Sequence, residues 1–172
     1  MSHWRYPGGI ELSETRSEKL SQVMKYRQPD LTVILEHVED PHNIAAVLRS
    51  CDAVGIREIY VIHPIGPLPK NYQSYASTSA DKWMIINSFK NIPDCIHEVR
   101  KSYKYIYGTH LNETAKDLYE LDLKESIALV FGNEKKGLSS ELLLHCDGNF
   151  QIPQVGMIRS LNISVACAVS IY

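Results

Sequence analysis

Short apolar segments alternate with a helical pattern along most of the chain. Residues 31–38, 58–63 and 103–109 are runs rich in β-branched and aromatic residues, which is typical of strands. Residues 41–54 lie between the first two runs and carry their apolar side chains at helical spacing. The other predicted elements are strands at 126–131 and 149–153 and helices at 93–101 and 160–172. Because two strands joined by a helix pair in parallel, the pattern predicts the α/β class, a parallel sheet with helices on both faces.

The pattern is less regular near the N-terminus and in the middle of the chain. Residues 15–18 have the spacing of a capping box and open a predicted helix that ends at Gln28-Pro29. The apolar face of this helix is expected to consist of Leu20, Val23 and Met24. Between His63 and Pro93, residues 74–79 are small and polar whereas residues 82–89 suit a strand, so the pattern leaves this segment open.

The composition is that of one globular domain. The chain has 172 residues, 44% hydrophobic and 22% charged, so it can bury a single core and is not disordered, collagen-like or a coiled coil. The predicted organisation is an N-terminal tail and short helix at 1–29 followed by one domain at 30–172. No apolar run reaches the roughly 20 residues of a membrane helix, and the N-terminus lacks the apolar core of a signal peptide. A cytoplasmic location is therefore expected.

The cysteines and the net charge narrow the function classes. Cys51, Cys95, Cys146 and Cys167 stand singly, without the spacing of metal ligands or of a CxxC motif. This argues against a disulfide framework and against a zinc site, and predicts reduced, mostly buried thiols. The 18 Lys and Arg residues oppose 20 Asp and Glu, which gives a net charge of −2. This net charge does not by itself indicate a nucleic-acid-binding protein, so any RNA site must be a local basic patch.

The helix at 41–54 has one side that faces the core and one that faces solvent. Asp40 is placed to cap it, and Pro41 suits its first turn. The buried stripe at helical spacing consists of Ile44, Val47, Leu48 and Cys51. Arg49 lies nearly opposite this stripe. By position alone, Arg49 is a surface arginine and Asn43 is a capping or turn residue.

A glycine-bearing loop follows the strand at 126–131. Residues 132–137 lead into a helix opened by Ser139, at the position where α/β sheets bind ligands. The loop is not a P-loop, because Leu138 follows the second glycine where Lys and Ser or Thr are required, and the chain has no GxGxxG fingerprint. By its sequence alone it is a β-to-α connection whose glycines take positive φ, with Glu134 as a solvated charge.

The closing helix is apolar on nearly every face, so it is expected in a core or a subunit interface. It opens with Ser160 and Asn162. The first N–H groups of a helix lack helical partners and carry the positive end of its dipole, so they suit a ligand carboxylate or phosphate. The alternative is that Ser160 simply caps the helix.

Three segments occur in a specific order and spacing: residues 40–55 (DPHNIAAVLRSCDAVG), 129–139 (LVFGNEKKGLS) and 152–165 (IPQVGMIRSLNISV). Together they resemble the TrmH-type RNA ribose 2′-O-methyltransferases of the SPOUT superfamily. The resemblance extends from about Arg27 to the last residue. A narrower likeness, carried by residues 26–32, 40–55 and 79–83, is to the tRNA guanosine-2′-O-methyltransferases that modify the D-loop. It favours tRNA over ribosomal RNA.

This resemblance implies a fold, a cofactor and an assembly. The C-terminal part of the α/β domain would form a deep trefoil knot, and the protein would be a homodimer that needs no metal. Because the family continues the closing helix, that helix would be truncated at Tyr172. S-adenosylmethionine would bind in the knot, mainly through backbone groups. The implied cofactor residues are Thr109, Gly132, Asn133, Ile152, Met157 and Leu161, with Gln154, Val155 and Gly156 completing the last loop.

The resemblance also implies a catalytic set: Asn43, Arg49, Glu134, Ser160 and Asn162. The sulfonium methyl is already electrophilic, so the ribose hydroxyl must be lined up behind it and lose its proton. A guanidinium is not normally deprotonated, so Arg49 is expected to hold an RNA phosphate that accepts the proton, or to stabilise the alkoxide. Asn43 would position Arg49 or the ribose, and Glu134 would fix its loop. Ser160 and Asn162 would bind near the cofactor carboxylate or the nucleotide.

The implied function is S-adenosylmethionine-dependent methylation of a ribose 2′-hydroxyl of tRNA, at a D-loop guanosine. The expected RNA contacts are Arg27, Arg49, Lys135 and Arg159, with Arg16, Lys19, Lys25 and Lys136 as further candidates. Two alternatives stay open: the same chemistry on ribosomal RNA, and an RNA-binding protein of this fold without turnover, which the intact catalytic set argues against. A nicotinamide or nucleoside-triphosphate enzyme is disfavoured because the glycine fingerprints are absent.

Overall fold

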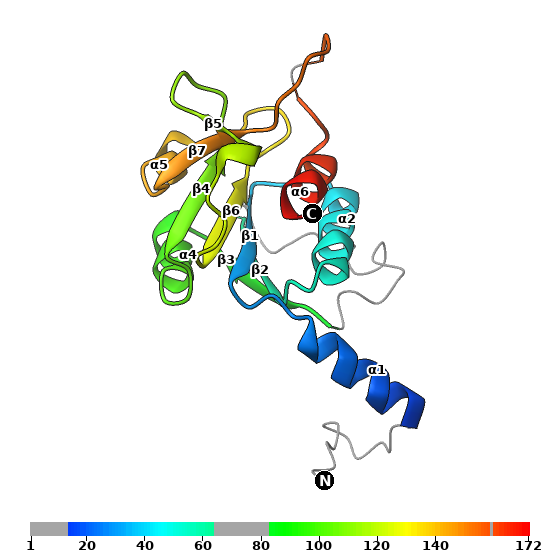
Figure 1. Ribbon diagram of the computed structural model, residues 1–172. Coiled ribbons are helices and arrows are strands. Elements are labelled where there is room, and N and C mark those ends of the chain that lie inside the picture. The colour runs from blue at the N-terminus through cyan, green and yellow to red at the C-terminus, as the bar shows by residue number, and fades with distance from the viewer. Residues whose placement is uncertain (1–13, 64–82, 159) are drawn as a thin grey trace.

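The computed structural model describes residues 14–63, 83–158 and 160–172. Within them the chain forms a seven-stranded sheet in the order β3-β2-β1-β6-β4-β7-β5, and every neighbouring pair is parallel (Figure 1). The strands are β1 (Leu31–Glu36), β2 (Glu58–Ile62), β3 (Ile85–Phe89), β4 (Tyr105–Thr109), β5 (Lys116–Asp117), β6 (Ile127–Phe131) and β7 (Gly148–Gln151). The predicted parallel α/β class is confirmed.

Helices cover both faces of this sheet, as the sequence predicts. α2 (Pro41–Ala53) and α6 (Ile163–Ile171) pack on one face, and α4 (Ile92–Val99) and the short α5 (Ser140–Leu143) pack on the other (Figure 1). A short 3₁₀ helix, η2 (Leu118–Glu120), follows β5. β1 contributes to both cores, since Val33 and Leu35 join the α2 side and Ile34 joins the α4 side, all fully buried. A central strand buried on both faces needs an unbroken apolar run, which is why β1 is recognisable in the sequence.

α2 forms as its sequence predicts. The Asp40 side chain caps it by accepting the His42 backbone N–H at 2.8 Å, and the four stripe residues are fully buried. Arg49 is exposed. The helix ends ahead of Gly55, whose φ of 89° is unfavourable for other residues and whose Cβ position is blocked by the Tyr26 backbone.

The first helix does not pack against the sheet. α1 (Glu14–Lys25) has no buried residue within the described structure, and Val23 and Met24 of its predicted apolar face are 39% and 67% exposed. It projects away from the sheet (Figure 1).

The closing helix begins later than predicted. α6 starts at Ile163 with Asn162 as its N-cap, and the Asn162 side chain accepts the Ser164 backbone N–H at 2.9 Å. The predicted start at residue 160 and the alternative that Ser160 caps this helix are therefore both wrong. One side of α6 is buried at Cys167 and Ile171, whereas on its other side Val165 remains 47% exposed in the part of the chain that the structure describes.

The segment between His63 and Pro93 is partly described. The strand that residues 82–89 suit is β3, which starts at Ile85 and pairs with β2 at the sheet edge. Residues 64–82, which include the small polar stretch 74–79, lie outside the described residues.

The four cysteines are free thiols, and three of them are buried. This confirms the expectation that the thiols are mostly buried. Burial raises the pKa of Cys95 and of Cys146 to about 12, so both remain protonated and unreactive near neutral pH. Among the described residues no helix is long and apolar enough to cross a membrane. In the same residues no three His, Cys, Asp or Glu side chains gather as metal ligands would.

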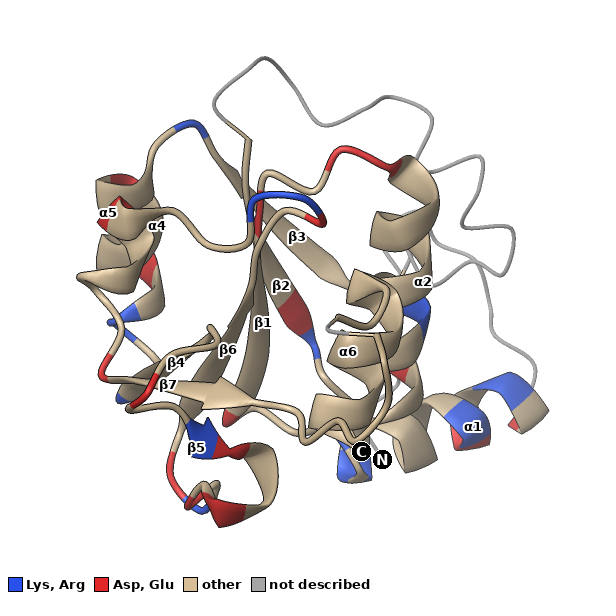
Figure 2. Cartoon of the chain, turned by 90° about the horizontal axis from the view of Figure 1, so that it is seen from above, with Lys and Arg blue, Asp and Glu red and all other residues tan. Residues whose placement is uncertain are grey.

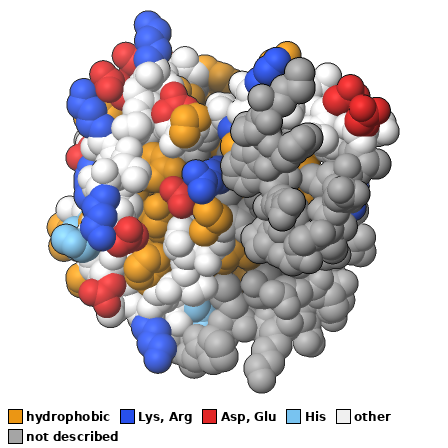
Figure 3. Space-filling model, turned by 90° about the horizontal axis from the view of Figure 1, so that it is seen from below, with side chains coloured by type: hydrophobic (Ala, Val, Ile, Leu, Met, Phe, Trp, Pro, Cys, Tyr) orange, Lys and Arg blue, Asp and Glu red, His pale blue; other side chains and the backbone are white. Residues whose placement is uncertain are grey.

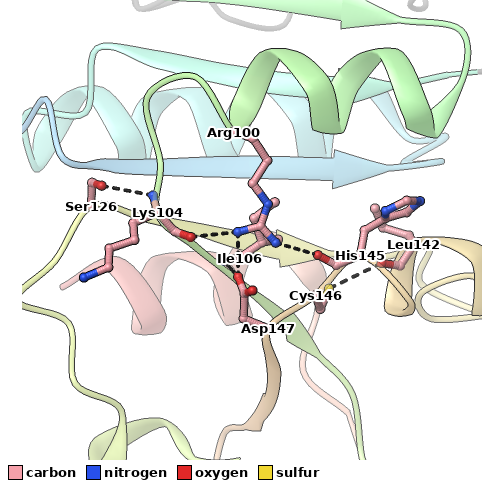
Figure 4. A network of polar contacts seen from close by, with 8 residues as sticks. All are labelled: Arg100, Lys104, Ile106, Ser126, Leu142, His145, Cys146 and Asp147. Carbon is pink, nitrogen blue, oxygen red and sulfur yellow. Dashed lines mark hydrogen bonds and ion pairs between the residues drawn. The ribbon is translucent and has the colours of Figure 1, made fainter.

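A network of polar contacts ties α4, β4 and β7 together (Figure 4). Arg100 follows α4 and donates hydrogen bonds to the Lys104 carbonyl at 2.7 Å, to the His145 carbonyl at 2.9 Å and to the Asp147 carboxylate at 2.7 Å. Asp147 also accepts the backbone N–H of Ile106 at 2.7 Å. Because β4 and β7 both start here, the network fixes their pairing at the amino edge of the sheet.

A second polar cluster lies at the same edge, around Glu58. The hydroxyls of Tyr60 and Tyr103 donate to one Glu58 oxygen at 3.2 and 3.1 Å. Burial, and then the nearby Glu58 carboxylate, raises the pKa of both tyrosines well above the ordinary value. Both phenols therefore stay neutral hydrogen-bond donors to Glu58.

Candidate active site

The opposite, carboxyl edge of the sheet carries a cavity of about 440 Å³. Figure 2 views the molecule from this edge. The cavity wall is contributed by residues 109–111 after β4, by the 131–137 loop after β6, and by parts of 150–154 and 160–166 around β7 and α6. This is the edge at which parallel α/β sheets bind ligands, because the loops that follow neighbouring strands converge there.

Most of the predicted cofactor residues line this cavity. They are Thr109, Gly132, Asn133, Ile152 and Leu161, together with Gln154 of the last loop. Met157 does not line it and is 99% exposed. Val155 and Gly156 border a second hollow of about 410 Å³ instead. Residues 155–158 extend away from the body (Figure 1). The two hollows adjoin, since Ile152 and Gln154 line both of them.

The 132–137 loop is closed on itself. The Asn133 N–H donates to the Gly137 carbonyl at 3.1 Å, and the Gly137 N–H donates back at 2.8 Å. Gly137 has the positive φ that the sequence predicts, 68°. Gly132 does not: it is required for space, because a Cβ there would collide with the backbone of Gly137 and Leu138.

Asn133 organises the loop through its side chain. Its Oδ1 accepts the backbone N–H groups of Lys135 and Lys136 at 2.9 and 3.1 Å, and its Nδ2 donates to the His37 carbonyl at 2.9 Å. Both lysines therefore have a defined backbone next to the cavity while their side chains stay exposed. Cations held at a cavity mouth can contact an anionic ligand.

Three of the five predicted catalytic residues form one chain of hydrogen bonds. Asn43 Nδ2 donates to Glu134 Oε1 at 2.7 Å, and Asn162 Nδ2 donates to Asn43 Oδ1 at 3.1 Å. The three side chains come from α2, from the loop after β6 and from the N-cap of α6, so the chain joins segments far apart in sequence. Asn43 is 8% exposed, and Glu134 therefore has a buried amide as its partner.

Ser160 and Arg49 are placed differently. Ser160 lines the cavity beside Leu161. Arg49 follows Asn43 by six positions on α2, which is about 240° around the helix, so the two side chains leave it on different sides. Within the described residues no hydrogen bond or ion pair joins Arg49 to the other four.

The predicted RNA contacts fall into two groups. The Arg27 guanidinium donates to the Ile56 carbonyl at 2.8 Å and to the Trp83 carbonyl at 3.3 Å, and it lies 3.7 Å from the Asp52 carboxylate. Its side chain is only 14% exposed, and it lies beyond α1 rather than on it, so it ties the start of β1 to the α2–β2 connection. Lys135 and Lys136 are exposed at the cavity, and Arg16, Lys19 and Lys25 are exposed on α1. Arg159 lies outside the described residues.

Two residues at the end of β1 take part in this edge although the sequence did not point to them. Glu36 is 2% exposed and accepts hydrogen bonds from Ser139. His37 has a φ of 54° and presents its carbonyl to Asn133. The available signal was the glutamate at the end of a strand buried on both faces, since a buried carboxylate requires specific partners.

Comparison with known proteins identifies the family. Residues 30–172 match the family model described as the SpoU rRNA Methylase family. This chain belongs to that family. One relative of this chain is the tRNA (guanosine(18)-2′-O)-methyltransferase of Thermus thermophilus. It is 39% identical over 94% of this chain and 82% of the relative. The enzyme of the same name from Escherichia coli K12 is 34% identical over 94% and 69%.

Some relatives of this chain are named for ribosomal RNA instead of tRNA. A 23S rRNA (guanosine-2′-O-)-methyltransferase of Xanthomonas campestris is 32% identical over 98% of this chain and 66% of the relative. Among solved structures, the TrmH/SpoU tRNA modifying enzyme of Aquifex aeolicus has a TM-score of 0.80 at 32% identity, over 92% of this chain and 80% of that one. An AdoMet-bound rRNA methyltransferase from Sinorhizobium meliloti has a TM-score of 0.73 at 27% identity, over 85% and 56%.

Proposed function

We propose that this SpoU-family chain transfers a methyl group from S-adenosylmethionine to a ribose 2′-hydroxyl of tRNA, at a guanosine of the D-loop. The observation that carries the proposal is the cavity at the carboxyl edge with the hydrogen-bonded Glu134, Asn43 and Asn162 beside it. The relatives from Thermus and Escherichia, both named for guanosine 18 of tRNA, support this substrate.

The cavity suits S-adenosylmethionine in size and chemistry. Its volume is within the range of about 300–1,000 Å³ that small-molecule sites span. Ile152 and Leu161 offer apolar contacts for an adenine ring, and the bare backbone of Gly132 leaves room for close approach. Thr109 and Asn133 complete the proposed cofactor site. When bound, the cofactor supplies an electrophilic methyl group on its sulfonium sulfur.

The chain's own residues then have to position and deprotonate the ribose hydroxyl. Asn43 is held between two partners and can orient the ribose or the residues around it. Glu134 fixes the loop against α2, since one of its carboxylate oxygens accepts the Asn43 amide. Arg49 binds an RNA phosphate, which takes up the hydroxyl proton as the oxygen attacks. Ser160, which lines the cavity, and Asn162, which bonds Asn43, are the proposed contacts to the nucleotide or the cofactor carboxylate.

RNA approaches the carboxyl edge in this proposal. Lys135 and Lys136 lie at the cavity, and Arg49 is exposed on α2. On the opposite face, seen from below in Figure 3, basic and acidic side chains are interspersed rather than gathered by sign. Because the chain has a net charge of −2, affinity for RNA depends on such local cations and is expected to fall steeply with salt.

We further propose that the SpoU domain at 30–172 is a cytoplasmic homodimer with a C-terminal trefoil knot. β7 lies next to the edge strand of the sheet, residues 152–158 extend away from the body after it, and α6 then packs on α2 (Figure 1). The solved A. aeolicus structure, at a TM-score of 0.80, supports a common chain path. Arg49 does not face Asn43 of its own chain. In a dimer, Arg49 of one subunit can therefore complete the catalytic site of the other subunit.

Arg49→Ala is expected to reduce methyl transfer at least about a hundredfold while leaving cofactor affinity unchanged, because it removes the charge that orients the phosphate. The measurement is transfer of labelled methyl to an unmodified tRNA transcript, with the product nucleotide mapped. Arg57→Ala, at another exposed arginine, is the matched control. Transfer only to ribosomal RNA would show that the substrate is ribosomal RNA and not tRNA. No transfer to any RNA would contradict the proposed function.

Mixing subunits tests the shared site. Arg49→Ala and Asn162→Ala homodimers are each expected to be nearly inactive. Random exchange between them makes heterodimers in which one of two sites is intact, so about a quarter of full activity should return. The assay is methyl transfer before and after subunit exchange. Activity that stays at the level of the separate variants would argue against a site built from two subunits.

A further inference from the structure

A buried carboxylate at the end of β1 holds the loop that lines the cavity. Glu36 is 2% exposed, and both of its oxygens are used: one accepts the Ser139 backbone N–H at 2.8 Å and the other accepts the Ser139 hydroxyl at 2.5 Å. The Ser139 oxygen in turn accepts the Leu142 N–H at 3.1 Å as the N-cap of α5. A carboxylate taken out of water is costly unless its oxygens are satisfied, so this pairing strongly constrains where residue 139 lies.

The next residue holds the other end of the same loop. The His37 carbonyl accepts Asn133 Nδ2 at 2.9 Å, and its φ of 54° is a left-handed conformation that residues other than glycine rarely adopt. Strained backbone of this kind is concentrated at functional sites. Glu36, the last residue of β1, and His37, which follows it, therefore fix the positions of Ser139 and Asn133. These two residues bracket the loop.

Glu134 lies between these two anchors. Its carboxylate meets the Asn43 amide at 2.7 Å, a contact that requires the loop to stay in place relative to α2. Glu36 itself is not among the described residues that line the cavity. Any influence of Glu36 on the cavity is therefore indirect, and its side-chain hydrogen bonds reach the loop through Ser139.

We propose that Glu36 is a positioning residue for methyl transfer. By binding Ser139, Glu36 holds the 132–137 loop in the shape that forms the cofactor cavity. The same shape keeps Glu134 against Asn43. This inference rests on the proposed function, although the holding of the loop is a property of the free protein. The expected consequence is that Glu36 controls cofactor affinity without touching the cofactor.

Hydrogen exchange tests the holding of the loop without any ligand. In Glu36→Gln and in Ser139→Asp, the amides of a peptide covering 132–139 are expected to exchange about tenfold faster than in the unsubstituted chain, while β2 amides keep their rates. Ser139→Asp retains an acceptor for the Leu142 N–H but places a second carboxylate against Glu36, so it separates the cap from the Glu36 contact. Ser139→Thr keeps both hydrogen bonds, and residue 139 is exposed enough to accept the methyl group, so its exchange should match the unsubstituted chain.

Cofactor affinity tests the link to function. The dissociation constant of S-adenosylhomocysteine, measured by calorimetry, is expected to rise about tenfold in Glu36→Gln and in Ser139→Asp. The double variant should recover part of this loss, because the new amide can donate to the new carboxylate. Glu39→Gln, at an exposed carboxylate three positions further on, is the matched control and should bind within about twofold of the unsubstituted chain.

The outcomes separate the two proposals. A lower melting temperature of Glu36→Gln with unchanged loop exchange and unchanged affinity would make Glu36 merely structural and overturn the inference. If the unsubstituted chain does not bind S-adenosylhomocysteine, the proposed function fails. In that case the exchange rates alone decide whether Glu36 holds the loop.

Discussion

Gly132→Ala is expected to weaken binding of S-adenosylhomocysteine by more than about a hundredfold, measured by calorimetry, because the loop can no longer close. A methyl group at residue 132 would occupy the space of the Gly137 and Leu138 backbone. Backbone atoms cannot rotate aside as a flexible side chain can. The pair of hydrogen bonds between Asn133 and Gly137 must therefore open, and the cavity loses one wall.

Gly137→Ala is the matched control for this prediction. Its φ of 68° makes alanine strained by about 1 kcal/mol, but nothing lies within 4 Å of the added Cβ. We therefore expect a modest loss of stability, seen as a small drop in melting temperature, and a far smaller loss of affinity than in Gly132→Ala. Equal affinities of the two variants would contradict the steric account of Gly132.

The fold was predictable from the sequence wherever a local pattern matched the final environment. β1 is buried on both faces and α2 on one stripe, and these environments leave an unbroken apolar run and an i, i+3, i+4, i+7 pattern. α6 was predicted too long because Ser160 and Asn162 are both good caps. Tertiary contact decides between them: Asn162 caps the helix while its amide bonds Asn43, which is 119 positions away in sequence.

Some residues of the candidate site were also predictable from the sequence, and others were not. The loops that form the cavity were found by resemblance, and the structure brings most of their residues together. Glu36 was missed because its partner Ser139 lies 103 positions away, so no local pattern reveals the pair. Arg27 was predicted only as an RNA contact, because the partners of its guanidinium are distant in sequence. These partners are the carbonyls of Ile56 and Trp83 and the carboxylate of Asp52. Its contact with RNA stays a prediction.

Asn43→Asp is expected to lower methyl transfer at about pH 8 by roughly a hundredfold, which corresponds to about 2.7 kcal/mol in the transition state. The substitution replaces a donor 2.7 Å from Glu134 with a second carboxylate at a position that is 8% exposed. Two like charges at this distance repel each other, and the Glu134 loop is pushed away from α2. The Asn162 amide keeps an acceptor, so the loss belongs to the Glu134 contact.

The pH dependence identifies this repulsion. One carboxyl group of the pair should have a pKa raised above its usual range, because protonation removes the repulsion and restores a shared hydrogen bond. A pKa that is raised in the folded state gives stability that is present at low pH and lost as pH rises through that pKa. The melting temperature of Asn43→Asp should therefore fall further below that of the unsubstituted chain between about pH 5 and pH 8. Asn43→Ala, which loses the donor without adding charge, should show a deficit that does not change over this range, and the same pH profile for both variants would contradict the assigned contact.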